Sequence, residues 1–175
     1  MLHGTFELIN NSKSKSLLFF PGVGGFEAYS GNKQYRNQAG CTHVKDIGPL
    51  PVGKYWIVNR PTGSLKSEFK QFITKDVINN ILQKPSPREE WFALYRDDGL
   101  INDSTYINQV QRTAFRLHPR GFWGDSYGCI TVDSYAEYKL IHKALLAQAT
   151  QRIPNTNIIT YGTITVYAKN TPACP

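Results

Sequence analysis

The sequence lacks the segments that would place a protein in or across a membrane. It has no apolar run close to the ~18 residues that a membrane-spanning helix needs. Its start, MLHGTFELINNSKSKS, has no basic stretch, apolar segment or small-residue cleavage site of a secretory signal. We therefore expect a protein that does not insert into membranes, is made in the cytoplasm without a signal peptide, and needs another machinery for any export.

Acidic residues are few, and the excess of basic residues is not concentrated anywhere. There are 20 Lys and Arg against 13 Asp and Glu, a net charge of +7. The densest basic pair, Lys13 and Lys15, lies in an expected hairpin turn. A nucleic-acid-binding protein gathers its basic residues on one stripe with aromatics between them. The charge therefore argues against a nucleic-acid partner and favours weak attraction to polyanions or to a carboxylate-bearing substrate.

Cysteine is also scarce, with three residues in the chain. Cys41 and His43 are two metal-ligand types close together, but a structural zinc site needs four ligands and no second pair has a matching spacing. We therefore expect no metal and no cofactor. Internal repeats, low-complexity tracts and linkers are absent as well, which leaves one domain over residues 1–175.

What the chain does contain is short segments of alternating hydrophobicity between turn residues. Residues 5–10 and 16–20 flank a polar turn and predict a β-hairpin. Hydrophobic residues make up 41% of the chain, enough to bury a core. Further strands rich in β-branched and aromatic residues are predicted at 54–59, 90–96, 113–118 and 162–169.

Two segments have helical periodicity. Apolar residues recur at helical spacing over 68–83, and Pro85 ends the pattern. Residues 134–149 begin with the capping box Ser134-x-x-Glu137 and present one apolar face. The predicted fold is therefore mainly β with two helices, an α+β domain.

The segment 116–132, RLHPRGFWGDSYGCITV, concentrates the residues that could perform chemistry. A predicted strand ends at His118 and a Gly-rich aromatic loop leads to Cys129, so that the imidazole and the thiol can meet. A thiol attacks carbonyl groups as the thiolate, and at a reference pKa of ~8.5 only about 3% is ionised at pH 7. Lowering the pKa of the Cys129 thiol would raise its reactivity only about a few-fold, because the thiolate becomes less nucleophilic as its pKa falls. Protonation of the leaving amine by His118 is worth more, about 10²–10⁴-fold.

Two neighbours would support such a pair. Gly128 lets the backbone approach the nucleophile, where the amide of Cys129 or of an adjacent residue would form an oxyanion hole. Ser126 would donate a hydrogen bond to this loop or to the substrate. A lone cysteine between Gly and Ile is also typical of a small core residue. The residues alone therefore leave a structural role for Cys129 open.

The same segment resembles a known family. Leu117-His118-Pro followed by Ser126-Tyr-Gly-Cys129-Ile resembles the His…Ser-x-Gly-Cys signature of L,D-transpeptidases, the YkuD-like enzymes of peptidoglycan. The DUF2778 branch, which includes antibacterial effectors delivered by the type VI secretion system, is the more similar one over roughly residues 26–146. Its motifs match in order at Tyr29-Ser-Gly31, Gly48-Pro-Leu-Pro-Val-Gly53, Trp91-Phe-Ala-Leu-Tyr-Arg96, Arg112-x-x-x-Arg116-Leu-His118-Pro and Ser126-Tyr-Gly-Cys129-Ile.

The resemblance implies a YkuD-like β-sandwich catalytic domain and a defined reaction. Family members attack the bond between the L-centre of meso-diaminopimelate and the terminal D-alanine of a tetrapeptide stem. By position, Cys129 would be the nucleophile, His118 the acid and base, and the carbonyl of Pro119 the group that orients the imidazole. Whether water or an amine then takes the acyl group is left open, so both L,D-carboxypeptidase and L,D-transpeptidase activity are expected.

The resemblance also implies partners and a site of action. These are the tetrapeptide stems of peptidoglycan, the type VI secretion machinery and a cognate immunity protein that plugs the cleft at Cys129. The expected place of action is the periplasm of target bacteria.

Four further residues are candidates for contact with the substrate. Arg112 and Arg116 are predicted on one side of a single strand, and arginine suits stem-peptide carboxylates. Their alternative is ion pairing with Asp97, Asp98 or Asp103. Trp123 and Tyr127 would form an aromatic wall, or serve only in packing. The chain has Tyr127 and Thr131 where the family commonly has His and Arg.

Other functional classes remain open at this point. One is a non-catalytic module that binds cell-wall polymer through basic and aromatic residues. Another is a cysteine peptidase of the papain or NlpC type, which would place its cysteine before its histidine and at a helix N-terminus. Once Cys129 is assigned to the site, Cys41 and Cys174 are left, and in an oxidising periplasm they could form a disulfide.

Overall fold

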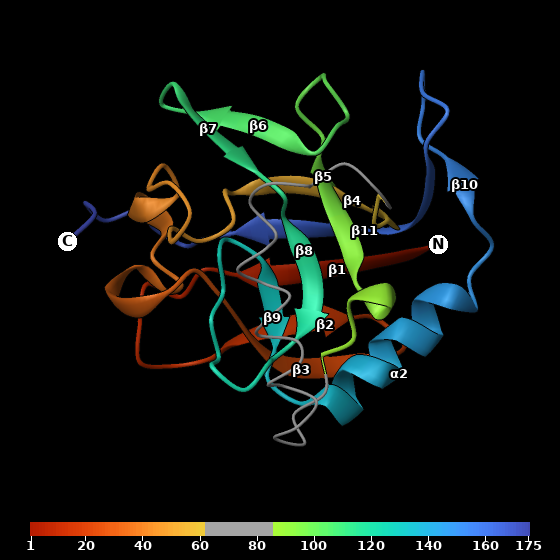
Figure 1. Ribbon diagram of the computed structural model, residues 1–175, viewed down its shortest axis with the longest axis horizontal. Helices are drawn as coiled ribbons and strands as arrows, with labels where there is room; N and C mark the ends of the chain where they lie inside the picture. Colours follow the sequence, from red (N-terminus) through yellow and green to blue (C-terminus); the bar gives the residue numbers. More distant parts are fainter. Residues whose placement is uncertain (62–85) are drawn as a thin grey trace.

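The computed structural model describes residues 1–61 and 86–175 (Figure 1). Among these residues there is one α-helix, α2 (Tyr135–Leu146), and there are short 3-10 turns at Lys33–Tyr35, Ala39–Cys41 and Arg88–Glu90. The strands are β1 (Leu2–Glu7), β2 (Ser16–Phe20), β3 (Gly24–Ser30), β4 (Gly53–Asn59), β5 (Phe92–Arg96), β6 (Ser104–Ile107), β7 (Val110–Thr113), β8 (Arg116–Pro119), β9 (Ile130–Val132), β10 (Gln151–Arg152) and β11 (Ile159–Tyr167).

The main sheet closes on itself. Its order is β1-β2-β3-β9-β8-β5-β4-β11, and β1 also pairs in parallel with β11, from Leu2 opposite Gly162 to Glu7 opposite Tyr167. The result is a closed eight-stranded β-barrel, with β10 added outside on β11. The predicted α+β fold with a YkuD-like β-sandwich is therefore wrong. The pairing that closes the barrel joins opposite ends of the chain, and local sequence patterns carry no signal for it.

The helix predicted at the C-terminal side of the nucleophile is confirmed. α2 begins after Ser134, whose side-chain oxygen accepts a hydrogen bond from the backbone N–H of Glu137 at 3.3 Å, which is the cap that the sequence predicts. The helix packs against β8, β9 and β11. The other predicted helix, 68–83, lies outside the described residues.

The barrel interior holds the apolar face of each strand. The core cluster combines the predicted hairpin residues with residues from the far end of the chain and from α2: Phe6, Leu8, Leu18, Phe20, Leu117, Ile130, Ile164, Val166, Tyr138, Ile141 and Leu145. Because side chains alternate along a strand, the residues next to Leu117 on β8 and next to Ile130 on β9 point to the opposite face of the sheet. That face of β8 and β9 carries His118 and Thr131.

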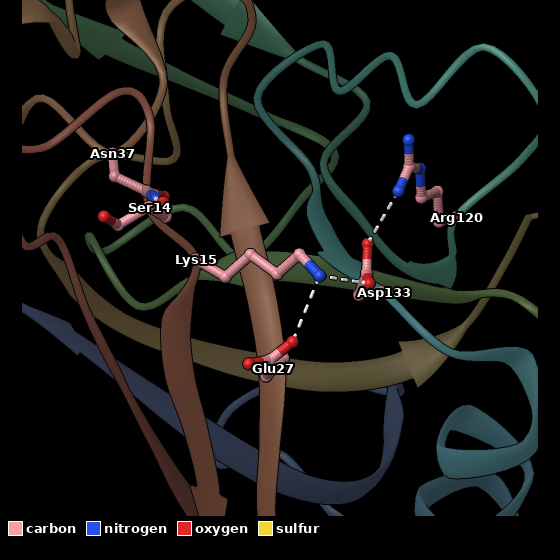
Figure 2. A network of polar contacts seen from close by, with 6 residues as sticks. All are labelled: Ser14, Lys15, Glu27, Asn37, Arg120 and Asp133. Atoms are coloured by element: carbon pink, nitrogen blue, oxygen red, sulfur yellow. Dashed lines mark hydrogen bonds and ion pairs between the residues drawn. The ribbon is translucent and has the colours of Figure 1, made fainter.

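Strands β8 and β9 lie side by side and parallel, at the centre of the view in Figure 1. Parallel neighbours require a crossover, and here the loop 120–129 provides it. Figure 2 shows how its ends are held: Arg120, after β8, and Lys15 both bind the carboxylate of Asp133, after β9, and Lys15 also binds Glu27 of β3. The backbone N–H of Arg120 donates to the carbonyl of Val132 at 2.7 Å.

The C-terminal tail is attached to the barrel by a disulfide. Cys41 and Cys174, 133 positions apart, are bonded with their Cα atoms 4.9 Å apart. The backbone of Gly40 approaches the tail so closely that a Cβ there would lie 1.9 Å from the carbonyl oxygen of Pro172. The disulfide that the cysteine count left open is therefore present.

Candidate active site

His118 and Cys129 lie on adjoining parallel strands. Leu117 is opposite Ile130 and His118 is opposite Thr131, so Cys129, directly before β9, is next to Arg116 at the start of β8. Because side chains alternate along a strand, one face of the sheet carries Arg116, His118, Cys129 and Thr131. His118 and Cys129 are diagonal neighbours on this face. A cysteine directly before a strand, and after its histidine in the chain, is unlike the helix N-terminal cysteine of a papain or NlpC-type peptidase.

The contacts of His118 fix its ring and its tautomer. Its Nδ1 lies 2.8 Å from the carbonyl oxygen of Pro119, the contact that the resemblance implies. A carbonyl oxygen only accepts, so Nδ1 carries the proton and Nε2 is the basic nitrogen. Nε2 lies 3.3 Å from the hydroxyl of Thr131, which donates to it. One face of the imidazole is stacked on Trp91, with ring centroids 4.3 Å apart and an interplanar angle of 20°.

Burial determines the charge state of both groups. Burial lowers the pKa of His118 to about 4, and the charges of Arg116 and Arg88 act in the same direction against the opposing Pro119 hydrogen bond. Burial raises the pKa of Cys129 to about 11, although Arg116 opposes this shift. At neutral pH the resting site therefore holds a neutral thiol and a neutral imidazole. Because no thiolate is formed in advance, the thiol must give up its proton to the imidazole as it attacks.

The loop before Cys129 is held by buried hydrogen bonds. Ser126 is fully buried and donates to the carbonyl oxygen of Cys129 at 2.8 Å, while its Oγ accepts from the backbone N–H of Gly31 at 3.2 Å. Ser126 thus makes the loop contact, one of the two that the sequence left open. Gly128 has φ +81°, and a Cβ there would lie 2.6 Å from Nη2 of Arg112. Only glycine fits this position without strain.

The two candidate carboxylate-binding arginines are engaged within the protein. They lie on different strands, β7 and β8, because Ala114 between them has φ +60° and interrupts the single strand that was predicted. Arg112 donates to the carbonyl oxygens of Thr42 and Gly48, the latter at 2.8 Å. Arg116 forms an ion pair with Asp103, the alternative that the sequence left open.

The aromatic candidates lie on the crossover loop. Trp123 has 57% of its surface exposed and contacts Phe122 edge to face, with ring centroids 5.1 Å apart. The hydroxyl of Tyr127 donates to Asp125 at 3.4 Å. Trp123 is therefore available at the surface, whereas Tyr127 is oriented toward its own loop.

A comparison with protein families matches the Tlde1 domain over residues 24–156. The chain belongs to the Tlde1 domain family. Tlde1-domain proteins are type VI secretion effectors, which confirms that part of the resemblance. No curated protein matches the chain.

Membership of the Tlde1 family has consequences for partners and location. It implies antibacterial action, association with the secretion machinery, an immunity protein and secretion into target cells. None of the helices in the described ranges is long and apolar enough to cross a membrane. Within those ranges, 1–61 and 86–175, three or more potential metal ligands do not come together, and Cys41 is in the disulfide.

Sequence reasoning gave no role in this Tlde1-domain site to Trp91 or Thr131, and it named Asp103 only as one of three alternative ion-pair partners of the arginines. Trp91 lies on the imidazole face, Thr131 contacts Nε2 of His118, and Asp103 holds Arg116. The β-branched run Ile-Thr-Val after Cys129 could have revealed Thr131, since residues two apart on a strand share a face. Trp91 and Asp103 come from other parts of the chain, and only the closed sheet places them here.

Proposed function

We propose that this protein is an antibacterial cysteine enzyme that acts on tetrapeptide stems of peptidoglycan, as an L,D-carboxypeptidase or L,D-transpeptidase. The observation that carries the proposal is the position of His118 and Cys129 on one face of adjoining strands, with Nδ1 of the imidazole bound to Pro119. This hydrogen bond leaves Nε2 as the base. The net charge of +7 is favourable for a substrate with several carboxylates.

The reaction uses one proton carrier and one nucleophile. Nε2 of His118 takes the thiol proton as Sγ of Cys129 adds to the carbonyl carbon between the L-centre of meso-diaminopimelate and the terminal D-alanine. The tetrahedral intermediate then collapses, and His118 gives its proton to the leaving amine of D-alanine. A thioester remains on Cys129. Water releases a tripeptide, or the amine of another D-amino acid takes the acyl group.

The low proton affinity of His118 suits the second half of this sequence. An imidazolium with a pKa near 4 is a strong acid, so it transfers its proton readily to a departing amine. The hydroxyl of Thr131 occupies Nε2 in the resting site, and must turn away before the nitrogen can accept the thiol proton.

The test is mass spectrometry of a disaccharide-tetrapeptide incubated with the protein. We expect loss of one terminal alanine, and no loss with Cys129→Ala or His118→Ala. His3→Ala, which removes a histidine bonded to Thr163 on β11, is the matched control and should retain the activity. Added D-amino acid distinguishes exchange from hydrolysis by the mass of the product. Unchanged substrate with folded wild-type protein would refute the proposal and favour a non-catalytic wall-binding module.

A further inference from the structure

An ion pair lies directly beside the proposed nucleophile. Nη1 and Nη2 of Arg116 contact Oδ1 and Oδ2 of Asp103 at 2.5 Å and 2.6 Å, a bidentate arrangement. The arginine side chain is 3% exposed and the aspartate 30%. Nη1 also donates to the carbonyl oxygen of Phe115 at 2.8 Å. The guanidinium is thus fixed in place, and its charge is shielded from water more than that of its partner.

The strand register connects this pair to Cys129. Arg116 is one position before Leu117 and Cys129 one before Ile130, and these two are opposite each other in the β8–β9 ladder. The backbone of Arg116 also acts on the sulfur and lowers the pKa of the Cys129 thiol. The thiol itself is directed at the carbonyl oxygen of Ala114, 3.9 Å away.

The charged groups around the sulfur come from two strands and from the residue that precedes a third. Arg116 of β8 and Arg112 of β7 favour the thiolate, and Asp103, before β6, opposes it. The neutral imidazole of His118 shares the face. Because Cys129 is only 7% exposed, little water is present to screen these charges. Fixed charges therefore have larger effects on the thiol than they would at the surface.

We propose that Arg116 is a positioning residue for the nucleophile: its guanidinium, held by Asp103, stabilises the negative charge that Cys129 develops when it attacks. Asp103 then has two opposing effects, since it fixes the guanidinium and also cancels part of its field. The β6–β7 hairpin, next to β8 in Figure 1, contributes to the site through this aspartate. The inference rests on the proposed role of Cys129 as nucleophile.

The test measures the thiol without any peptidoglycan. Cys129 is the one free cysteine, so alkylation by iodoacetamide, followed by intact mass across a pH series, reports on it alone. Thiolate absorbance, read against Cys129→Ala, gives a second measurement if alkylation is slow. For Arg116→Met we expect the pH at which alkylation of Cys129 is half-maximal to rise by about one unit, as for loss of a neighbouring opposite charge. For Asp103→Asn we expect a shift downward, because the amide still accepts one hydrogen bond and no longer cancels the charge.

Shifts of opposite sign separate this proposal from a purely structural ion pair. If the pair only maintains the fold, both variants disturb the same contact and the two profiles move in the same direction or not at all, which would refute the proposal. Arg116→Lys should stay close to wild type, since it retains the charge. Lys54→Met removes an exposed pair with Asp97 and is the matched control.

A double variant covers the risk that a single substitution unfolds the protein. Arg116→Met with Asp103→Asn removes both charges of the ion pair, so neither partner is left buried without the other. Its profile should lie above wild type and below Arg116→Met, because the favourable effect of Arg116 exceeds the opposing one of Asp103. A profile at or below wild type would contradict the inference. None of these outcomes depends on tetrapeptide cleavage, so failure of the proposed function would be seen separately.

Discussion

Reduction of the disulfide between Cys41 and Cys174 should lower the stability of this protein by a measurable and large amount. The bond closes a loop across 133 positions of the 175-residue chain. β11 ends a few residues before Cys174 and pairs with β1 and β4, so the barrel closes without the cross-link. We therefore expect the reduced protein to fold, with the loss arising mainly from greater freedom of the unfolded chain.

The magnitude follows from loop-closure entropy. For a loop of 133 residues, the cross-link removes about 17 cal/mol/K from the unfolded state, about 5 kcal/mol at 25 °C. For a urea dependence of about 2 kcal/mol/M, typical of small proteins, the unfolding midpoint should fall by about 2.5 M. A loss of this size is comparable to the whole stability of many domains, about 5–15 kcal/mol.

Urea unfolding of the oxidised and the reduced protein is the appropriate assay. Cys174→Ser should match the reduced wild type, and its midpoint should not respond to reductant. Equal midpoints for oxidised and reduced wild type would refute the reasoning, because the entropy difference would then be absent. Since disulfides form in oxidising compartments, the expected consequence is a protein that reaches full stability only after it leaves the cytoplasm.

Two further outcomes follow from the site. The imidazole of His118 stays neutral in the folded state until its pKa of about 4, whereas the unfolded chain binds a proton from about 6.5; its contribution to stability is present above pH 6.5 and is lost as pH falls to 4. Between pH 6.5 and 4, the free energy of unfolding measured in urea should therefore fall by about 3 kcal/mol more for wild type than for His118→Gln. Parallel pH dependences of the two proteins would contradict this prediction. Gly128→Ala should reduce both stability and D-alanine release more than Gly124→Ala, although both glycines have positive φ, because Cβ at 128 meets Nη2 of Arg112 at 2.6 Å and the ring of Phe115, whereas Cβ at 124 meets only the flexible side chain of Arg120. Equal losses in thermal unfolding and mass spectrometry would show that φ alone decides.

Features encoded by adjacent residues could be predicted from the sequence. The cap at Ser134 and the hairpin of β1 and β2 depend on residues a few positions apart, and both are present. The contact of His118 with Pro119 is similarly local. Closure of the barrel by β1 and β11 depends on a pairing between chain ends, and only the folded chain contains that information.

The arginines illustrate how one backbone angle changes a prediction. Alternation placed Arg112 and Arg116 on one side of a strand, which made both appear available to a substrate. Ala114 adopts a left-handed conformation that L-residues seldom take, and it separates the two into β7 and β8. No residue type at that position signals the break, since alanine has no preference for positive φ.

Arg112 connects the disulfide-linked segment to the nucleophile loop. Its guanidinium donates to the carbonyls of Thr42, next to Cys41, and of Gly48, and its Nη2 fills the space that a side chain at Gly128 would need. A lysine carries its donors on one atom and cannot reach carbonyls in the same planar, forked way. The arginine and the glycine therefore depend on each other, because the guanidinium can occupy this position only where residue 128 has no Cβ. Arg112 thus links the loop that carries Cys129 to the segment that the disulfide joins to the C-terminal tail.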